Sequence, residues 1–152
     1  MRLLGSIWET SENTQLVRNR KVINKYLRRI ERTSDQTLSL DSHGFCCFAF
    51  QKFLIIIEVP EDDEAKWFLS AKVFDLKSRS DTKIKLNQRK EAVQLSGMQL
   101  GTKGATLGLD GNELNLCFSM PVTGLKYNGM ADILEDFMQS AVEINARLRN
   151  VR

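Results

Sequence analysis

Residues 95–114 read LSGMQLGTKGATLGLDGNEL, and this stretch decides the fold that we expect. It passes from the end of a helix, through a strand spaced by glycines, into a tight turn at Asp110-Gly111. Asp-Gly between alternating residues is among the strongest short-range signals of a β-hairpin. We therefore expect strands at 102–109 and 113–120 that pair antiparallel.

The helix before this hairpin is expected to start at Ser80 or Asp81, either of which is suited to cap it, and to run to Leu100. On a helical wheel its apolar residues fall into two clusters that lie almost opposite each other. The clusters are Ile84, Leu95 and Met98, and Leu86, Val93, Gly97 and Leu100. A helix with two apolar faces is expected to be buried on both sides. In so small a chain, the second side is expected to meet another protomer.

The middle of the chain carries short runs of aromatic and β-branched residues separated by turn residues, a pattern typical of strands. The runs are 37–40, 45–50, 53–59 and 67–74. The links are short, because a turn ending at Gly44 precedes the second run and only two residues separate the second run from the third. Such links join neighbouring strands of an antiparallel meander.

Residues 16–32 predict an amphipathic helix, with Ser11 or Asn13 as its expected cap. Its apolar stripe comprises Leu16, Ile23, Tyr26, Leu27 and Ile30, and its opposite face comprises Arg18, Lys21, Lys25, Arg28, Arg29 and Arg32. Residues 1–33 hold eight basic and three acidic side chains, a balance of +5 in a chain whose net charge is +3. The basic character therefore belongs to the first helix.

The elements follow the order α-β-β-β(β)-α-β-β-α, an α+β layer arrangement in which Asn128 caps the last helix. A chain of 152 residues, 42% of them hydrophobic, suits one globular domain over 1–152. The longest apolar run, 53–57, is far shorter than the roughly 20 residues that span a membrane. The first residues lack the apolar core of a signal peptide, so we expect a cytoplasmic protein with no membrane partner.

No motif with a catalytic mechanism stands out, so we expect no enzyme, no cofactor and no metal. The single histidine, His43, excludes a histidine triad or a two-histidine metal site within one chain. Gly101, Gly104 and Gly108 follow a helix and enter a hairpin, whereas phosphate-binding glycine loops lead into a helix. The acidic loop 61–64 lacks the spaced ligands of a calcium loop. Three cysteines form no closed disulfide set and are expected as structural thiols.

Three stretches, taken in order, give the chain a likeness to a known family. They are Leu38-Ser-Leu-Asp with Phe48-Ala-Phe and Phe53-Leu-Ile-Ile-Ile-Glu-Val; the stretch 95–110; and Met130-Ala-Asp-Ile-Leu-Glu-Asp-Phe-Met. In their order and spacing, these stretches resemble the CesT (Tir chaperone) family of type III secretion effector chaperones. The resemblance covers most of 35–149 and is weakest in the first helix, 1–33.

The resemblance implies a twisted antiparallel sheet with three helices, usually in a homodimer. The implied function is that of a dimeric, ATP-independent chaperone in the bacterial cytoplasm. Such a chaperone binds the extended N-terminal segment of a secreted effector, keeps it soluble and secretion-competent, and presents it to the secretion ATPase. Binding would use strand addition and apolar pockets, without covalent chemistry.

The resemblance also implies where partners bind. Effector contacts are expected in a groove between the first helix and the strands from 38 to 74. The candidates are Leu27, Ile30, Phe45, Phe48, Phe50, Ile55, Ile57, Trp67 and Leu69. Half of them must face the core, and the sequence leaves open which half. The dimer contact is expected at the middle helix and the neighbouring strand, with candidates Leu86, Val93, Gly97, Leu100, Gly104 and Leu107.

The charge of the chain departs from the family pattern. Members of this family are typically acidic, whereas this chain has a pI near 8.8 because of its first helix. The excess indicates an acidic partner surface or effector beside that helix. It also leaves open a nucleic-acid-binding or general protein-interaction module, because clustered Arg and Lys attract phosphates. The six cations carry no interleaved aromatic residues, which favours a solvated or protein-facing helix.

Overall fold

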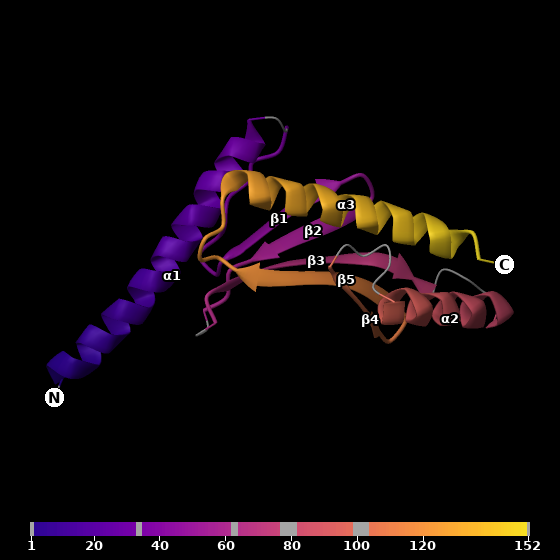
Figure 1. The fold of residues 1–152 in the computed structure, drawn as a ribbon, viewed down its shortest axis with the longest axis horizontal. Coiled ribbons are helices and arrows are strands. Elements are labelled where there is room, and N and C mark those ends of the chain that lie inside the picture. Colours follow the sequence, from indigo (N-terminus) through magenta and orange to yellow (C-terminus); the bar gives the residue numbers. More distant parts are fainter. Residues whose placement is uncertain (1, 33–34, 62–63, 77–81, 99–103, 152) are drawn as a thin grey trace.

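The structure is a computed structural model. It describes the backbone of residues 2–32, 35–61, 64–76, 82–98 and 104–151, and their side chains except those of 2–13 and 95–98. The elements are α1 (Arg2–Glu31), β1 (Phe45–Phe50), β2 (Phe53–Glu58), β3 (Lys66–Asp75), α2 (Thr82–Met98), β4 (Thr106–Asp110), β5 (Glu113–Pro121) and α3 (Tyr127–Arg149). Within the described residues, these three helices and five strands confirm the expected α+β order (Figure 1).

The strands form one antiparallel sheet in the order β1-β2-β3-β5-β4. The longest pairing joins β3 to β5 along nearly the whole of both strands. β4 and β5 form the expected hairpin around Asp110 and Gly111. Gly111 has a φ of 61°, in the left-handed region that the tight turn requires. This order leaves β1 and β4 at the two edges of the sheet.

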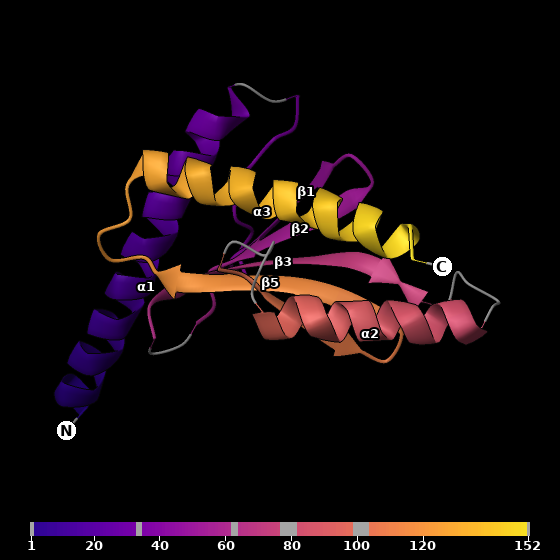
Figure 2. The ribbon, with the colours of Figure 1, turned by 45° about the vertical axis from the view of Figure 1, so that its right-hand side comes forward.

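One face of the sheet forms the core. β2 contributes Phe53, Ile55 and Ile57 to it, and β3 contributes Trp67 and Leu69, all of them at most 4% exposed. α3 runs along the sheet, and α2 lies beside β4 near the C-terminal end of α3 (Figure 2). Alternate strand residues are buried because helices cover only this face.

The apolar stripe of α3 fits this face. Its residues at helical spacing are buried: Met130, Leu134, Phe137, Ala141, Ile144 and Leu148. The helix starts at Tyr127, and its N-cap is Lys126, which makes no side-chain capping hydrogen bond. The expectation that Asn128 caps this helix was therefore wrong, because Asn128 already has helical backbone.

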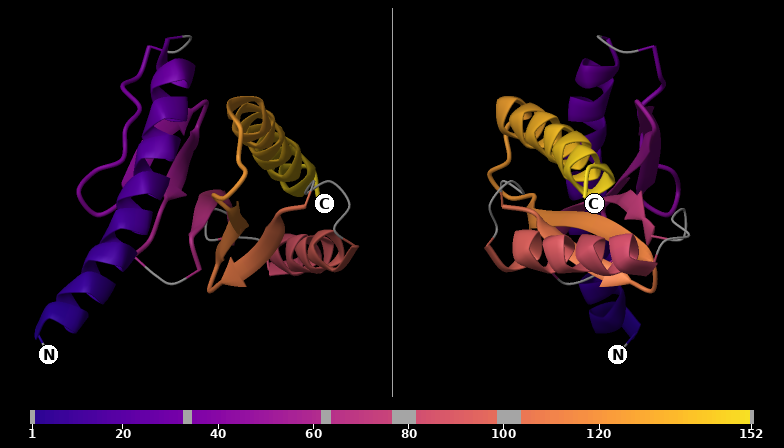
Figure 3. Two further views of the ribbon diagram at one scale, coloured as in Figure 1. Left: turned by 60° about the vertical axis from the view of Figure 1, so that its left-hand side comes forward. Right: turned by 90° about the vertical axis from the view of Figure 1, so that its right-hand side faces the viewer.

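α1 crosses one end of the sheet and continues past the other elements (Figures 1 and 3). Ile23 and Leu27, from its predicted apolar stripe, are fully buried. The hydroxyl of Tyr26 donates a hydrogen bond to the carbonyl oxygen of Leu125 at 2.7 Å. These contacts fix the second half of α1 against the loop that leads into α3.

The start of α1 differs from the sequence prediction. The helix begins at Arg2, so Ser11 and Asn13 lie inside it and do not cap it. No proline interrupts residues 2–13, so the helix that packs in its second half can continue toward the N-terminus.

Residues 37–40 do not form a strand, so the strand predicted there from the sequence was wrong. Side chains hold this segment instead of a backbone ladder. The amide of Leu40 donates to Asn24 Oδ1 on α1 at 2.7 Å. The side chain of Gln36 donates to the carbonyl of Ala49 at 2.7 Å and accepts from its amide at 2.8 Å. The outer edge of β1 is therefore partly occupied by this segment.

None of the described helices combines the length and the hydropathy that crossing a bilayer requires.

Candidate functional site

The candidate effector-binding residues separate into buried and accessible groups. Five of them are at most 1% exposed and belong to the core: Leu27, Ile55, Ile57, Trp67 and Leu69. Ile30, Phe48 and Phe50 are half-buried at the margin of this core. Phe45 is 38% exposed on the opposite face of the sheet. The structure therefore does not bring the nine residues together on one accessible surface.

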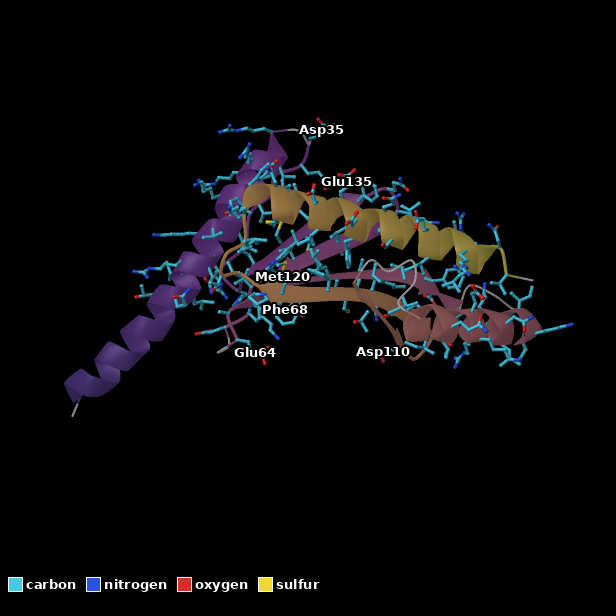
Figure 4. All side chains as sticks on the ribbon, in the orientation of Figure 1. Asp35, Glu64, Phe68, Asp110, Met120 and Glu135 are labelled. Carbon is cyan, nitrogen blue, oxygen red and sulfur yellow. The ribbon has the colours of Figure 1, made fainter. Side chains whose placement is uncertain are left out.

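The face of the sheet opposite the core carries apolar residues that the sequence candidates left out. Leu54 is 55% exposed, and Ile56 and Phe68 are half-buried. Phe68 lies on the side of the sheet opposite its near neighbour Met120 (Figure 4). Side chains alternate between the two faces of the sheet along β3, so the burial of Trp67 places its neighbour Phe68 on the open face. This alternation is the signal that would have identified Phe68 as accessible.

Strand register aligns these residues in rows across the open face. One row runs from Phe45 through Glu58 and Phe68 to Ser119. The next row runs through Cys47, Ile56, Ser70, Cys117 and Thr106, so small side chains occupy most of its centre. The second row therefore has smaller side chains at its centre than the first row, which contains Phe45 and Phe68.

Beside the end of the second row, β4 stops pairing with β5 at Thr106 opposite Cys117. A hollow of about 250 Å³ is lined by Phe68, Gly104, Thr106, Cys117, Phe118 and Ser119. Phe118 also makes an edge-to-face contact with Trp67, at 6.2 Å between ring centroids. Partial burial raises the pKa of the Cys117 thiol, so this thiol is a weak nucleophile at neutral pH. The hollow is therefore suited to apolar contacts and to hydrogen bonds with hydroxyl groups, and not to covalent chemistry.

A second hollow lies where β2 and β3 separate. These strands pair only from Ile56 opposite Ser70 to Glu58 opposite Phe68, and beyond Ser70 they diverge (Figure 2). The hollow has a volume of about 330 Å³. It is lined by Lys52, Phe53, Leu54, Lys72, Val73, Phe74, Asp75 and Asn145.

In this hollow, Asn145 of α3 makes a hydrogen bond to the backbone of β3, where β2 no longer pairs with it. Its Nδ2 donates to the carbonyl oxygen of Val73 at 2.7 Å. Its Oδ1 is buried and accepts no hydrogen bond from any described residue. An unsatisfied buried acceptor is costly and calls for a donor such as water or the amide of another chain.

The hollow also contains a charged group. The ammonium of Lys72 lies 3.2 Å from a carboxylate oxygen of Asp75 and 3.5 Å from one of Glu113. Hydrogen bonding and attraction from Asp75 raise the pKa of Lys72. The lysine therefore remains cationic beside the separated strands.

The dimer-contact candidates lie on α2 and around β4. Leu86 and Val93 are 53% and 67% exposed. Gly104 is exposed, with a φ of 89°, whereas Leu107 is 4% exposed and belongs to the core. Leu100 and the surroundings of Gly97 lie outside the described residues. Leu109 is a further exposed apolar residue, at 44%, that the sequence candidates did not include.

The other side of α2 packs inside the chain. Ala92 is buried, and Gln88 is fully buried and donates its amide to the carbonyl of Leu148 at 2.9 Å. Arg147 and Glu91 form an ion pair at 2.6 Å nearby. Leu86 and Val93 therefore form an apolar surface with no cover from the described residues of this chain.

The basic face of α1 is exposed along its length, as the helical wheel predicted. Its members are Arg18, Lys21, Lys25, Arg28, Arg29 and Arg32. Nitrogen-tipped side chains project from α1 away from the sheet (Figure 4). The guanidinium of Arg29 lies 3.9 Å from the ring centroid of Tyr127, which itself contacts Tyr26 edge to face. This aromatic pair fixes the end of the basic face next to α3.

Among the described residues, no group of three or more His, Cys, Asp or Glu side chains could hold a metal ion. The described cysteines are all free thiols. The accessible features that the described residues form therefore include two apolar surfaces, the two hollows above and a basic helix face.

The family model of the Tir chaperone protein (CesT) family matches residues 25–145. The search of curated proteins gave no match.

Solved structures share the fold at low sequence identity. A chain of the ExsC-ExsE complex has a TM-score of 0.68 and 14% identity, with 85% of this chain and 95% of that chain covered. A chain of the HopA1-SchA chaperone-effector complex has a TM-score of 0.63 and 16% identity, with 83% and 91% covered. A chain of the ExoU-SpcU complex from the type III secretion system of Pseudomonas aeruginosa has a TM-score of 0.56 and 12% identity, with 82% and 95% covered.

These likenesses establish the fold, and the family model spans far more than half of the chain. The match confirms the resemblance seen in the sequence. The chain belongs to the Tir chaperone protein (CesT) family.

Proposed function

We propose that this protein is a dimeric, ATP-independent chaperone that binds the extended N-terminal segment of a type III secretion effector and keeps it soluble and secretion-competent. The observation that carries this proposal is the open face of the sheet, where Phe45, Leu54, Ile56 and Phe68 remain accessible in a family member. Solved chains of the same fold come from a chaperone-effector complex and from a type III secretion system complex.

The open face suits an extended chain better than a folded one. The row that contains Cys47, Ser70 and Cys117 places small side chains beside the larger Phe45 and Phe68 of the neighbouring row. Alternate side chains of an extended segment would lie over this row of small residues and in the hollow near Cys117. Covering these side chains together would keep apolar residues of the segment out of water and away from aggregation.

Backbone recognition would use the hollow between β2 and β3. The outer edge of β1 already pairs with Gln36 at Ala49, so a full added strand there has a competitor. The separated ends of β2 and β3 have no such cover, and Asn145 Oδ1 lacks a donor among the described residues. A backbone amide of the segment would supply that donor.

The buried candidates have a supporting role in this proposal. Trp67 and Leu69 form the floor beneath the open face, while Phe48, Phe50 and Ile30 are accessible only at the margin. The segment is proposed to contact the exposed and half-buried residues, and no step requires covalent chemistry or a nucleotide. Presentation to the secretion ATPase belongs to the same proposal.

Dimer formation is proposed at α2 and β4. Leu86, Val93 and Leu109 would bury their exposed surfaces there. A Cβ atom at Gly108 would meet no described atom within 4 Å, so space within this chain does not explain the glycine. Close approach of a second copy to β4 would account for it.

Co-expression tests the binding proposal. The chain is produced with the N-terminal segments of secreted proteins that are encoded beside it, and retention is measured after affinity purification. The variant Phe45→Lys/Leu54→Lys places charges on the open face and is expected to reduce retention at least about tenfold. The matched control is Val17→Lys on α1, which is 48% exposed in the native chain and is expected to retain the segment.

Two results would contradict the proposal. One is equal loss of the segment in the open-face variant and in Val17→Lys. The other is full retention by both, with circular dichroism showing that each variant is folded. Light scattering of the free chain should give about twice the monomer mass of 17.4 kDa.

A further inference from the structure

The cations of α1 form a straight stripe. Arg18, Lys21, Lys25 and Arg28 of α1, and Arg32 one residue past its end, follow one another in steps of three and four residues, with Arg29 beside the end of the row. Residues spaced in this way share one side of a helix. At 1.5 Å per residue the stripe is about 21 Å long.

The stripe is exposed and uncompensated. None of its cations forms an ion pair with a described residue, whereas Lys66, Lys72 and Arg147 elsewhere in the chain each do. Like charges at three- and four-residue spacing repel each other and weaken an isolated helix. The helix therefore carries a cost that an acidic partner would relieve.

The fold holds this stripe in place. On the opposite side of the same helix, Ile23 and Leu27 are fully buried. Arg20, which lies off the stripe, donates hydrogen bonds to the carbonyl oxygens of Val59 and His43. Because the scaffold fixes the backbone of α1, the entropy lost when a partner binds is mainly that of the side chains.

We propose that the α1 stripe binds an acidic amphipathic helix of another protein. Carboxylates at three- and four-residue spacing on a partner helix repeat every 5.3 Å or so, which matches the stripe along its whole length. Alternate side chains of an extended segment repeat about every 6.7 Å, and five of them would span about 27 Å. The stripe therefore fits a helix better than a strand.

The same features disfavour nucleic acid as the partner. Duplex DNA places one negative charge every 1.7 Å or so and meets a protein over a broad surface. Outside residues 1–33 this chain has a net charge of −2, so its body repels such a polyanion. The ring of Tyr127, next to the stripe, is covered by Arg29 and does not offer a stacking face on that side. The proposal concerns α1 alone and is independent of the effector role.

Synthetic peptides test this inference with the full chain. The first peptide has five Glu residues at three- and four-residue spacing in an Ala/Gln helix. The second has the same composition with the Glu residues distributed around the helix, and the third keeps the spacing but contains two central Pro residues. Fluorescence anisotropy at low and moderate salt gives the dissociation constants, and a 20-nucleotide single strand of DNA is measured in parallel.

The striped helix should bind about tenfold or more tightly than either other peptide, with an affinity that falls steeply as salt rises. Lys21→Glu/Arg28→Glu should weaken this binding at least about tenfold. Lys83→Glu/Lys90→Glu makes a comparable change of charge at two exposed lysines off α1 and should change it less than about twofold. Circular dichroism checks that both variants fold.

Several outcomes would overturn the inference. Equal affinity for all three peptides would mean that net charge alone is recognised. Tighter binding of the DNA strand would assign the stripe to nucleic acid. Self-association of the free chain at low salt that Lys21→Glu/Arg28→Glu abolishes would make a second copy the partner.

Discussion

The guanidinium group of Arg20 donates two hydrogen bonds to the carbonyl oxygen of Val59, from Nε at 3.2 Å and from Nη2 at 3.0 Å. Nη2 also lies 3.2 Å from the carbonyl oxygen of His43. One side chain of α1 thus joins the end of β2 to the turn before β1. The basic stripe and the sheet are held in a fixed relation by this group.

Replacing Arg20 by Met should lower the free energy of unfolding by about 1–3 kcal/mol, because the stem is retained while the carbonyl oxygens lose a charged donor. Urea unfolding measures the change. Arg18→Met is the matched control, since Arg18 is exposed and should change stability by less than about 0.5 kcal/mol. Equal losses in the two variants would show that Arg20 does not anchor α1.

Gly44 is the second part of this junction. Its φ is 85°, and a Cβ atom there would lie 2.4 Å from the carbonyl oxygen of Val59 and 2.6 Å from Nη2 of Arg20. Gly44→Ala should therefore cost roughly 2–4 kcal/mol, from backbone strain together with displacement of Arg20. Gly111→Ala has a similar positive φ but no described atom within 4 Å of the new Cβ. It should cost only about 1 kcal/mol in the same urea experiment. A similar cost in both variants would mean that strain alone matters.

Asp41 gives this junction a dependence on pH. Its Oδ1 accepts hydrogen bonds from the amides of Phe45 at 3.0 Å and His43 at 2.9 Å. The bond from Phe45 is the largest cause that lowers the pKa of Asp41 below its usual 3.8. A lowered folded-state pKa stabilises the fold above the unfolded value, and this contribution is lost as pH falls through the folded value.

Below about pH 4, the native chain should therefore lose more stability than Asp41→Asn does, because the amide variant has no carboxylate to protonate. Urea midpoints between pH 2 and pH 7 check this prediction. Parallel curves for the two proteins over that range would contradict it. Above pH 5 the two curves should keep a constant separation.

Much of the fold could be predicted from the sequence because its signals are local. The bounds of β1 and β2 agree with the expected runs to within one residue, since short turns around Gly44 and Gln51 separate them. The Asp110-Gly111 hairpin likewise depends on adjacent residues. The failures involve contacts between distant residues. In the segment 37–40, the amide of Leu40 donates to the side chain of Asn24 on α1, and the side chain of the preceding Gln36 pairs with Ala49 of β1.

The site was harder to predict than the fold. Aromatic and branched residues occupy both faces of β1 and β2, as Phe45 and Phe48 illustrate, so composition does not reveal which face the helices cover. The packing of α3 against β3, in which Trp67 and Leu69 are buried, decides that phase. Leu54 and Phe68 were therefore left out, while five core residues were included among the candidates.

Leu86 and Val93 provide a test of the proposed dimer. Leu86→Lys/Val93→Lys should change the mass in light scattering from about twice 17.4 kDa to 17.4 kDa. The monomer should remain folded, because both side chains are more than half exposed within one chain. Leu54→Lys is the control, with similar exposure on the open face, and should remain dimeric. A dimer in all variants would place the contact elsewhere.

Asn145 and Ser140 lie on the buried side of α3, and removing their polar groups should change the free energy of unfolding in opposite directions. Asn145→Leu leaves the carbonyl oxygen of Val73 without its donor and should cost about 1–3 kcal/mol in urea unfolding. The buried hydroxyl of Ser140 has no hydrogen-bond partner among the described residues, so Ser140→Ala should be neutral or should stabilise by up to about 1 kcal/mol. A loss in Ser140→Ala as large as that in Asn145→Leu would mean that the hydroxyl binds a partner such as an ordered water. The unpaired Oδ1 of Asn145 would then also be attributed to water rather than to a missing chain.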